Sequence, residues 1–230
     1  MQPHLFCNWK TYLPSEEQAA QIAAAMKQTT GVTVALFPSM LHIPRVASVI
    51  EGSGILLGAQ DISRNSTAPH TGRASGEQLT SIGVTHVLVG HVETRNSGVT
   101  NAMVVEKVRH AHESNLVPVL CVSDTDGRDP MQEVSRALDS LTHPQAVIVY
   151  EPSDHVGTDR ACNEEHIAAV CDQIRSVLQS IAPETPVLYG GSVNEANAKQ
   201  IMTNGSVDGF LIGRASIDQK EILALSKSLC

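Results

Sequence analysis

Aromatic residues are scarce in this sequence. Its 230 residues include one Trp, three Tyr and three Phe, together 3% of the chain, so the core must be aliphatic. A chain of this length can still bury a sizeable core, because it hides roughly 70% or more of its unfolded surface.

Long apolar runs and a secretory signal are also missing. No apolar run approaches the ~18–20 residues that span a bilayer. Residues 1–17 have neither a basic head nor an apolar h-region. The five cysteines are odd in number and show no CxxC spacing. We therefore expect a cytoplasmic protein with free thiols and no membrane partner.

Basic residues are outnumbered. The 16 Lys and Arg against 24 Asp and Glu leave a net charge of -8. Because nucleic-acid binding depends on clustered Lys and Arg, we expect no nucleic-acid partner. A small anionic ligand held by one local site remains compatible with this charge.

Eight short apolar runs recur along the chain and predict strands that are buried on both faces. They are Leu5–Cys7, Val32–Phe37, Gly54–Ala59, His86–Gly90, Val117–Val122, Ala146–Tyr150, Pro186–Tyr189 and Asp208–Ile212. Helical spacing fills the stretches between them, most clearly at Asn101–His112, Cys162–Leu178 and Asp218–Leu229. Capping boxes predict helix starts at Ser15, Ser192 and Ser216.

Eight repeats of strand and helix predict a parallel sheet with helical crossovers. Each unit has about 29 residues, which a mean strand, a mean helix and two short loops nearly fill. We therefore predict an α/β fold, a closed (β/α)8 barrel, with residues 1–230 forming a single domain. The alternative is an open doubly wound sheet. Such a sheet usually has a glycine-rich first turn, whereas residues 8–12 contain no glycine.

Chemistry in such a barrel takes place at the C-terminal ends of the strands. Lys10 follows the first predicted strand, His91 and Glu93 follow the fourth, and Glu151 follows the sixth. A carboxylate can remove a proton beside a carbonyl if a hydrogen-bond donor stabilises the resulting enediolate. A lysine adds positive charge for the developing oxyanion or a substrate phosphate.

Two glycine-containing turns follow the seventh and eighth predicted strands. Gly190-Gly191-Ser192 and Gly213-Arg214 each lead toward a helix start, where backbone N–H groups favour an anion. In many barrels these two loops bind a phosphate. Glycines that only shape tight turns would explain the same pattern, so both interpretations stay open.

Six motifs at predicted strand ends resemble those of the triosephosphate isomerase family, in the same order and over nearly the whole chain. They are Asn8-Trp9-Lys10, Gly58-Ala59-Gln60-Asp61, Gly90-His91-x-Glu93-x-Arg95, Tyr150-Glu151-Pro152 with Gly157-Thr158, Leu188-Tyr189-Gly190-Gly191-Ser192-Val193 and Asp208-Gly209-Phe210-Leu211-Ile212-Gly213. Each motif is weak alone, but six in order are a specific signal. The family fold is the TIM barrel.

The resemblance implies a role for each residue of the site. Glu151 would be the base that moves a proton between two carbons, and His91 the neutral electrophile at the carbonyl, a pairing already known for this family. Lys10 would polarise the substrate, with Asn8 as its hydrogen-bond partner. Glu93 would support Lys10 and the substrate pocket.

The resemblance also implies the substrate, a small phosphorylated sugar. The reaction would interconvert D-glyceraldehyde 3-phosphate and dihydroxyacetone phosphate, a step of glycolysis and gluconeogenesis, with no metal and no organic cofactor. Residues 153–160 would form a lid that excludes water from the enediolate. The phosphate would bind at Gly157, Gly191, Ser192, Gly213 and Arg214.

Several positions depart from the family pattern. Val92 and Thr94 replace a serine and an arginine after the histidine, and Arg73 replaces the glutamate that would pair with that arginine, so the last two changes look coupled. The lid begins with Ser153-Asp154-His155 instead of a hydrophobe and a tryptophan, and Arg214 replaces the second glycine after the eighth strand. The changed lid and Arg214 motivate an alternative substrate, a ketose phosphate with four or five carbons. A phospho-ligand binding barrel without turnover is a third hypothesis.

The assembly also follows from the resemblance. His70-Thr71-Gly72 and a short region after the fifth predicted strand resemble the compact archaeal-type branch of the family. The family default is a homodimer, whereas members of that branch tend to be tetramers. We therefore expect a homo-oligomer, with dimer and tetramer both open.

Overall fold

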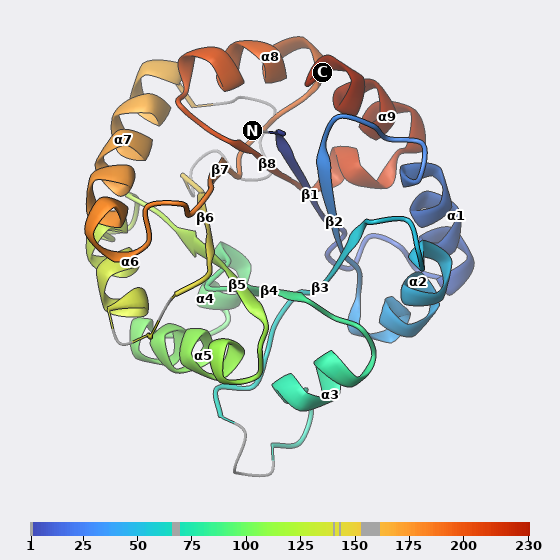
Figure 1. Cartoon of the computed structure of the whole chain (residues 1–230), viewed down its shortest axis with the longest axis horizontal. Helices are drawn as coiled ribbons and strands as arrows, with labels where there is room; N and C mark the ends of the chain where they lie inside the picture. Colours follow the sequence, from blue (N-terminus) through green and yellow to red (C-terminus); the bar gives the residue numbers. More distant parts are fainter. Residues whose placement is uncertain (1, 66–69, 140, 143, 153–161) are drawn as a thin grey trace.

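The computed structural model describes residues 2–65, 70–139, 141–142, 144–152 and 162–230 (Figure 1). Eight parallel strands close into a barrel in sequence order, because β8 pairs with β1. The strands are β1 (His4–Asn8), β2 (Thr33–Phe37), β3 (Leu56–Ala59), β4 (His86–Val89), β5 (Val117–Val122), β6 (Val147–Tyr150), β7 (Val187–Tyr189) and β8 (Gly209–Ile212). Each lies within two residues of its predicted bounds. The predicted (β/α)8 barrel is confirmed, and the open sheet is excluded.

Helices surround the strands in an outer ring (Figure 1). They are α1 (Glu16–Met26), α2 (Ile43–Ile50), α3 (Gly76–Ser81), α4 (Val92–Asn96), α5 (Asn101–Glu113), α6 (Pro130–Leu138), α7 (Glu164–Ile181), α8 (Glu195–Asn204) and α9 (Gln219–Ser228), with the 3-10 turns η1 (Met40–His42) and η3 (Arg214–Ile217). The three helices predicted most clearly correspond to α5, α7 and α9. In the described part of the chain, no helix is long and apolar enough to span a membrane.

Two of the three predicted helix caps are wrong. Ser15 caps α1 as predicted, but α8 is capped by Asn194 and α9 by Asp218. Ser192 and Ser216 lie upstream of these caps, because the chain first completes the turns after β7 and β8. Those two turns line the mouth of the barrel, so the shifted caps affect the site directly.

The barrel closes where β1 meets β8. His4 pairs with Gly209 in the parallel register. Gly209 has a φ of 155°, and a Cβ on it would stand 2.1 Å from the carbonyl oxygen of His4. Only a glycine allows the two strands to approach so closely.

The core has two parts, one inside the barrel and one between the strands and the helices. The residues of the inner cluster are Phe6, Ala35, Phe37, Leu88, Val119, Cys121, Val147, Val149, Leu188 and Leu211. The outer cluster is dominated by Val, Ile, Leu and Ala, as predicted. The few aromatic side chains are nevertheless concentrated in the interior. Those exposed by 1% or less are Phe6, Trp9, Phe37, Tyr150, Tyr189 and Phe210.

Candidate active site

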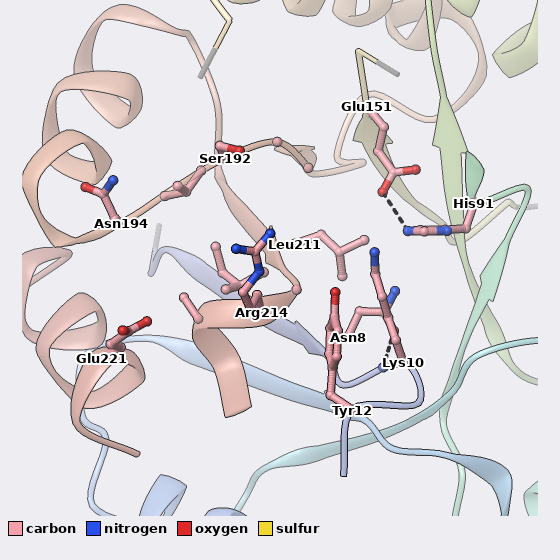
Figure 2. Close-up of a pocket in the computed structure, with 16 residues that line it drawn as sticks. Asn8, Lys10, Tyr12, His91, Glu151, Ser192, Asn194, Leu211, Arg214 and Glu221 are labelled. Carbon is pink, nitrogen blue, oxygen red and sulfur yellow. Dashed lines mark hydrogen bonds and ion pairs between the residues drawn. The ribbon is translucent and has the colours of Figure 1, made fainter. Parts of the chain in front are cut away.

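A pocket of about 330 Å³ lies at the C-terminal end of the barrel (Figure 2). It collects residues that follow β1, β4, β6, β7 and β8. The lining residues are Asn8, Lys10, Tyr12, His91, Glu151, Gly190, Gly191, Ser192, Val193, Asn194, Leu211, Ile212, Gly213, Arg214, Ala215 and Glu221. Apart from Glu93, every described residue that the sequence proposed for the site is in this set.

Lys10 enters the pocket from a turn after β1 whose backbone is unusual. Its φ is 46°, in the left-handed region that non-glycine residues rarely occupy. The side chain of Asn8 accepts a hydrogen bond from the Lys10 amide at 3.1 Å, and Gln60 Nε2 donates to the Lys10 carbonyl at 2.8 Å. Such strain persists only where the surroundings fix the backbone. Asn8 and Gln60 fix it here, so the lysine is held in one place.

Glu93 holds the ammonium group of Lys10. Its Oε1 lies 2.8 Å from Lys10 Nζ, in the predicted pairing. Glu93 belongs to α4 and its side chain is 57% exposed, so it contacts the lysine from outside the pocket. Because solvent screens this exposed ion pair, it adds little to the free energy of unfolding. Its main effect is to orient the ammonium group.

His91 stands directly before α4 and acts as its N-cap. Its Nδ1 accepts a hydrogen bond from the Glu93 amide at 3.2 Å. Because a backbone N–H can only donate, Nδ1 carries no proton, and the ring proton is on Nε2. Nε2 lies 3.4 Å from Oε1 of Glu151 (Figure 2). His91 therefore presents a neutral ring with its N–H toward the carboxylate and the pocket.

Arg95 fixes the chain in front of His91. Its Nε donates to the carbonyl of Gly90 at 2.7 Å, and its Nη2 lies 3.2 Å from Oε1 of Glu133. Burial lowers the pKa of Arg95, and the charge of Glu133 opposes this effect. Arg128 adds two further hydrogen bonds to the same carboxylate. This buried cluster anchors the β4 end of the site.

Glu151 follows β6 and is only 3% exposed. Its second oxygen, Oε2, is buried and has no hydrogen-bond partner among the described residues. Cys121 lies against the carboxylate, and burial, followed by the charge of Glu151 and a hydrogen bond with it, raises the pKa of that thiol well above its usual value. A buried thiol with a raised pKa is a packing residue rather than a nucleophile. A buried carboxylate with an unsatisfied oxygen is suited to accepting a proton.

The two glycines of the turn after β7, Gly190 and Gly191, are required by close packing rather than by a left-handed backbone. None of Gly190, Gly191 and Gly213 has a φ in the left-handed region. A Cβ on Gly190 would stand 2.8 Å from Cγ of Glu151, and one on Gly191 would stand 2.1 Å from the hydroxyl of Tyr189. Tight-turn geometry thus does not explain Gly190 and Gly191, and Gly190 makes room for the carboxylate.

Ser192 and Gly213 are held by side chains from the elements that follow them. Asn197 Nδ2 donates to the carbonyl of Ser192 at 3.1 Å, and Ser216 Oγ donates to the carbonyl of Gly213 at 2.6 Å. Both turns are therefore fixed with their backbone along the pocket. Gly157 and the predicted lid lie outside the described residues.

The positions that depart from the family pattern have partners of their own. Arg73 donates to Oδ2 of Asp61 at 2.8 Å, and Thr94 Oγ1 donates to the carbonyl of His91 at 2.8 Å. Lys107 pairs with the other oxygen of Asp61. Arg73 and Thr94, which stand where the family has a glutamate–arginine ion pair, thus each make a contact of their own instead of pairing with each other.

Sequence reasoning missed four polar contributors to the site. They are Tyr12, Gln60, Asn194 and Glu221. Gln60 lies in a motif that the sequence singled out, but its contact with Lys10 spans fifty positions. Glu221 reaches the pocket from α9, and no local pattern marks it. Among the described residues no group of three His, Cys, Asp or Glu side chains could hold a metal ion.

The fold and the site together define a (β/α)8-barrel enzyme that performs acid–base chemistry at the C-terminal end of its strands. The comparisons with known proteins identify the family. A family model described as triosephosphate isomerase matches residues 3–229, and this chain belongs to that family.

Three curated relatives show how far the similarity extends. A triosephosphate isomerase from Nitrosococcus oceani is 33% identical over 245 aligned positions, which cover 98% of each chain. Another from Alkalilimnicola ehrlichii is 35% identical over 220 positions, covering 88% of each chain. A third from Acidiphilium cryptum is 31% identical over 243 positions, covering 96% of each chain. The likeness to the archaeal-type branch stays a prediction.

Proposed function

We propose that this chain interconverts D-glyceraldehyde 3-phosphate and dihydroxyacetone phosphate through an enediolate. The observation that carries the proposal is the 3.4 Å approach of His91 Nε2 to Glu151 Oε1, in one pocket with Lys10. The name that the relatives share supports the same reaction. Glycolysis and gluconeogenesis are the pathways in which this reaction takes part.

Glu151 removes a proton from the carbon beside the substrate carbonyl. The electron pair of the broken C–H bond then forms the enediolate, and Nε2–H of His91 donates to its oxygens. Lys10 adds a positive charge next to the developing oxyanion. Glu151 returns the proton to the neighbouring carbon, while the hydroxyl proton on the first carbon passes by way of Nε2 of His91 to the former carbonyl oxygen, so no atom is gained or lost. These proton transfers need neither a metal nor an organic cofactor.

The phosphate end of the substrate binds at the two turns. Gly191, Ser192, Gly213 and Arg214 line that side of the pocket on anchored turns, and we assign their backbone N–H groups to the phosphate. Fixed backbone dipoles stabilise an anion without the entropy loss of a flexible side chain. The part of Gly157 and of the lid in this step stays a prediction.

Glu151→Asp tests the base directly. The substitution keeps the charge but withdraws the carboxylate by about one C–C bond, and a misplacement of about 1 Å at a reacting centre can lower turnover by about 100-fold. We expect kcat to fall by at least that factor while KM changes little, because the phosphate turns are untouched. His91→Gln should also slow the chemistry. Steady-state assays in both directions measure these changes.

The exposed Glu113→Asp on α5 is the matched control, and it should leave both constants unchanged. Unchanged turnover in Glu151→Asp would remove Glu151 from its role. A much higher kcat/KM on a four-carbon ketose phosphate would replace the triose substrate. Phosphate-ester binding without any isomerisation by the unmodified protein would favour the binding barrel.

We also propose that the protein is a cytoplasmic homo-oligomer. Its cysteines are free thiols, as suits a reducing compartment. Met40 and Leu41 are 47% and 79% exposed, and Tyr12, after the neighbouring strand β1, is 41% exposed. Large apolar side chains left exposed after two paired strands support an interaction surface. A dimer is the family default and a tetramer the alternative.

Sedimentation velocity tests this assembly. We expect the unmodified chain to sediment as a dimer or a tetramer, and Leu41→Glu to shift it toward monomer, because a charge would be buried in the interface. Ile82→Glu, at another exposed apolar side chain, should leave the mass unchanged. A monomeric unmodified chain at micromolar concentration would contradict the proposal.

A further inference from the structure

We propose that the guanidinium group of Arg214 binds the phosphate of the substrate, so that this site selects its ligand with a charged side chain as well as with backbone amides. The inference rests on the proposed function of the pocket and deepens it. Arg214 is the first residue of η3, and its side chain lines the same pocket as Lys10, His91 and Glu151.

The position of Arg214 suits the non-reacting end of the substrate. Figure 2 shows its guanidinium pointing into the pocket, on the side of Ser192 and away from the pair formed by His91 and Glu151. A Cβ on the adjacent Gly213 would stand 3.7 Å from Cε of Lys10, so the lysine stem passes next to the same turn. Lys10 and Arg214 therefore both border the turn at which we place the phosphate.

The charges of the pocket explain why a second cation matters. The charged side chains among the described lining residues are Lys10 and Arg214 against Glu151 and Glu221, a sum of zero. Glu93 also approaches Lys10 to 2.8 Å and offsets its charge. Without Arg214 the described lining would carry net negative charge, which repels a phosphate ester. A guanidinium also matches phosphate geometry, because it can donate two parallel hydrogen bonds.

The test uses the whole chain and two matched variants, Arg214→Gln and Arg109→Gln. Both remove one positive charge from an exposed arginine, but Arg109 lies on α5, where it faces Glu113 at 3.8 Å. We expect Arg214→Gln to raise KM for the triose phosphate by about 10-fold or more, with kcat nearly unchanged, as for loss of a charged hydrogen bond. Arg214→Lys should restore part of the affinity, because it returns the positive charge without the planar guanidinium. Arg109→Gln should behave as the unmodified chain.

Calorimetric binding of inorganic phosphate separates this inference from the proposed function. We expect Arg214→Gln to weaken phosphate binding by a similar factor, a readout that needs no turnover. If the unmodified chain binds phosphate through Arg214 but isomerises no triose phosphate, the proposed function fails and this inference stands. Equal phosphate affinity and equal KM in Arg214→Gln and in the unmodified chain would overturn it. Lower thermal stability with unchanged phosphate affinity would assign Arg214 a structural role instead.

Discussion

His4 and His86 lie at the end of the barrel opposite the pocket, at the starts of β1 and β4. The ring of Phe6 lies between them, with centroids 5.6 Å and 5.9 Å away. Burial and, to a smaller extent, the charge of His4 lower the pKa of His86 to about 4. Burial also lowers the pKa of His4, which Asp208 partly opposes. Both imidazoles are therefore kept neutral in the folded chain.

These histidines make stability depend on pH. Below about pH 6.5 the unfolded chain takes up protons at His86 that the folded chain excludes until about pH 4, so the free energy of unfolding falls as the pH falls through this window. His86 alone accounts for up to about 3 kcal/mol. Urea denaturation between pH 7.5 and pH 4.5 measures this loss. We expect His86→Gln to flatten the profile and His112→Gln on α5 to leave it unchanged; equal slopes in both variants would contradict the assignment.

The sequence identified the reactive side chains of the site, but not the contacts that hold them in place. Lys10, His91 and Glu151 could be found because barrel topology brings every strand end to one mouth. The contact of Gln60 with the Lys10 carbonyl could not be found, because it joins residues that no local pattern connects. The left-handed backbone of Lys10 was equally hidden, since lysine usually avoids that conformation.

At the level of elements, strands were more predictable than helix ends. A strand buried on both faces reads as a short continuous apolar run, and all eight strands of this chain contain one. Helix caps depend on a competition among nearby polar residues. At α8 the side chain of Asn194 accepts from the Asn197 amide, and Asn197 accepts in return from the Asn194 amide at 2.8 Å. This reciprocal pair prevails over the serine two residues earlier, which the turn after β7 uses.

Asn194→Ala should separate the two roles of that cap. Loss of an N-cap lowers the free energy of unfolding by about 1 kcal/mol. We expect the same loss in Thr100→Ala, which removes the N-cap of α5 far from the pocket. Only Asn194→Ala should also raise KM, because Asn197 holds the Ser192 carbonyl. Denaturant unfolding and steady-state kinetics measure the two effects. Equal KM values in the two variants would show that the cap of α8 does not position the substrate site.

At the scale of the whole molecule, closure of the barrel depends on the seam between β1 and β8. Every strand contributes to the closed sheet, so a defect at one seam affects all eight. This architecture was predictable from the number and order of the strands. The glycine that closes it was not, because its partner lies at the other end of the chain.

Gly209→Ala should disrupt this seam. The new Cβ would meet the His4 carbonyl at 2.1 Å, with backbone strain in addition. We expect the free energy of unfolding to fall by about 3 kcal/mol or more. Gly52→Ala is the control, because its φ is 70° and nothing lies within 4 Å of the added carbon. That variant should lose only about 1–2 kcal/mol. Equal losses in urea denaturation would show that the close approach at the seam is unimportant.

The burial of Trp9 gives this molecule an optical reporter at its mouth. Trp9 is the only tryptophan in the sequence and is 1% exposed, and it stands between Asn8 and Lys10. Its indole N–H is buried and has no hydrogen-bond partner among the described residues. All tryptophan emission therefore comes from one fluorophore beside the lysine of the site. Without any label, its wavelength can follow both ligand binding at the pocket and the opening of the barrel during unfolding.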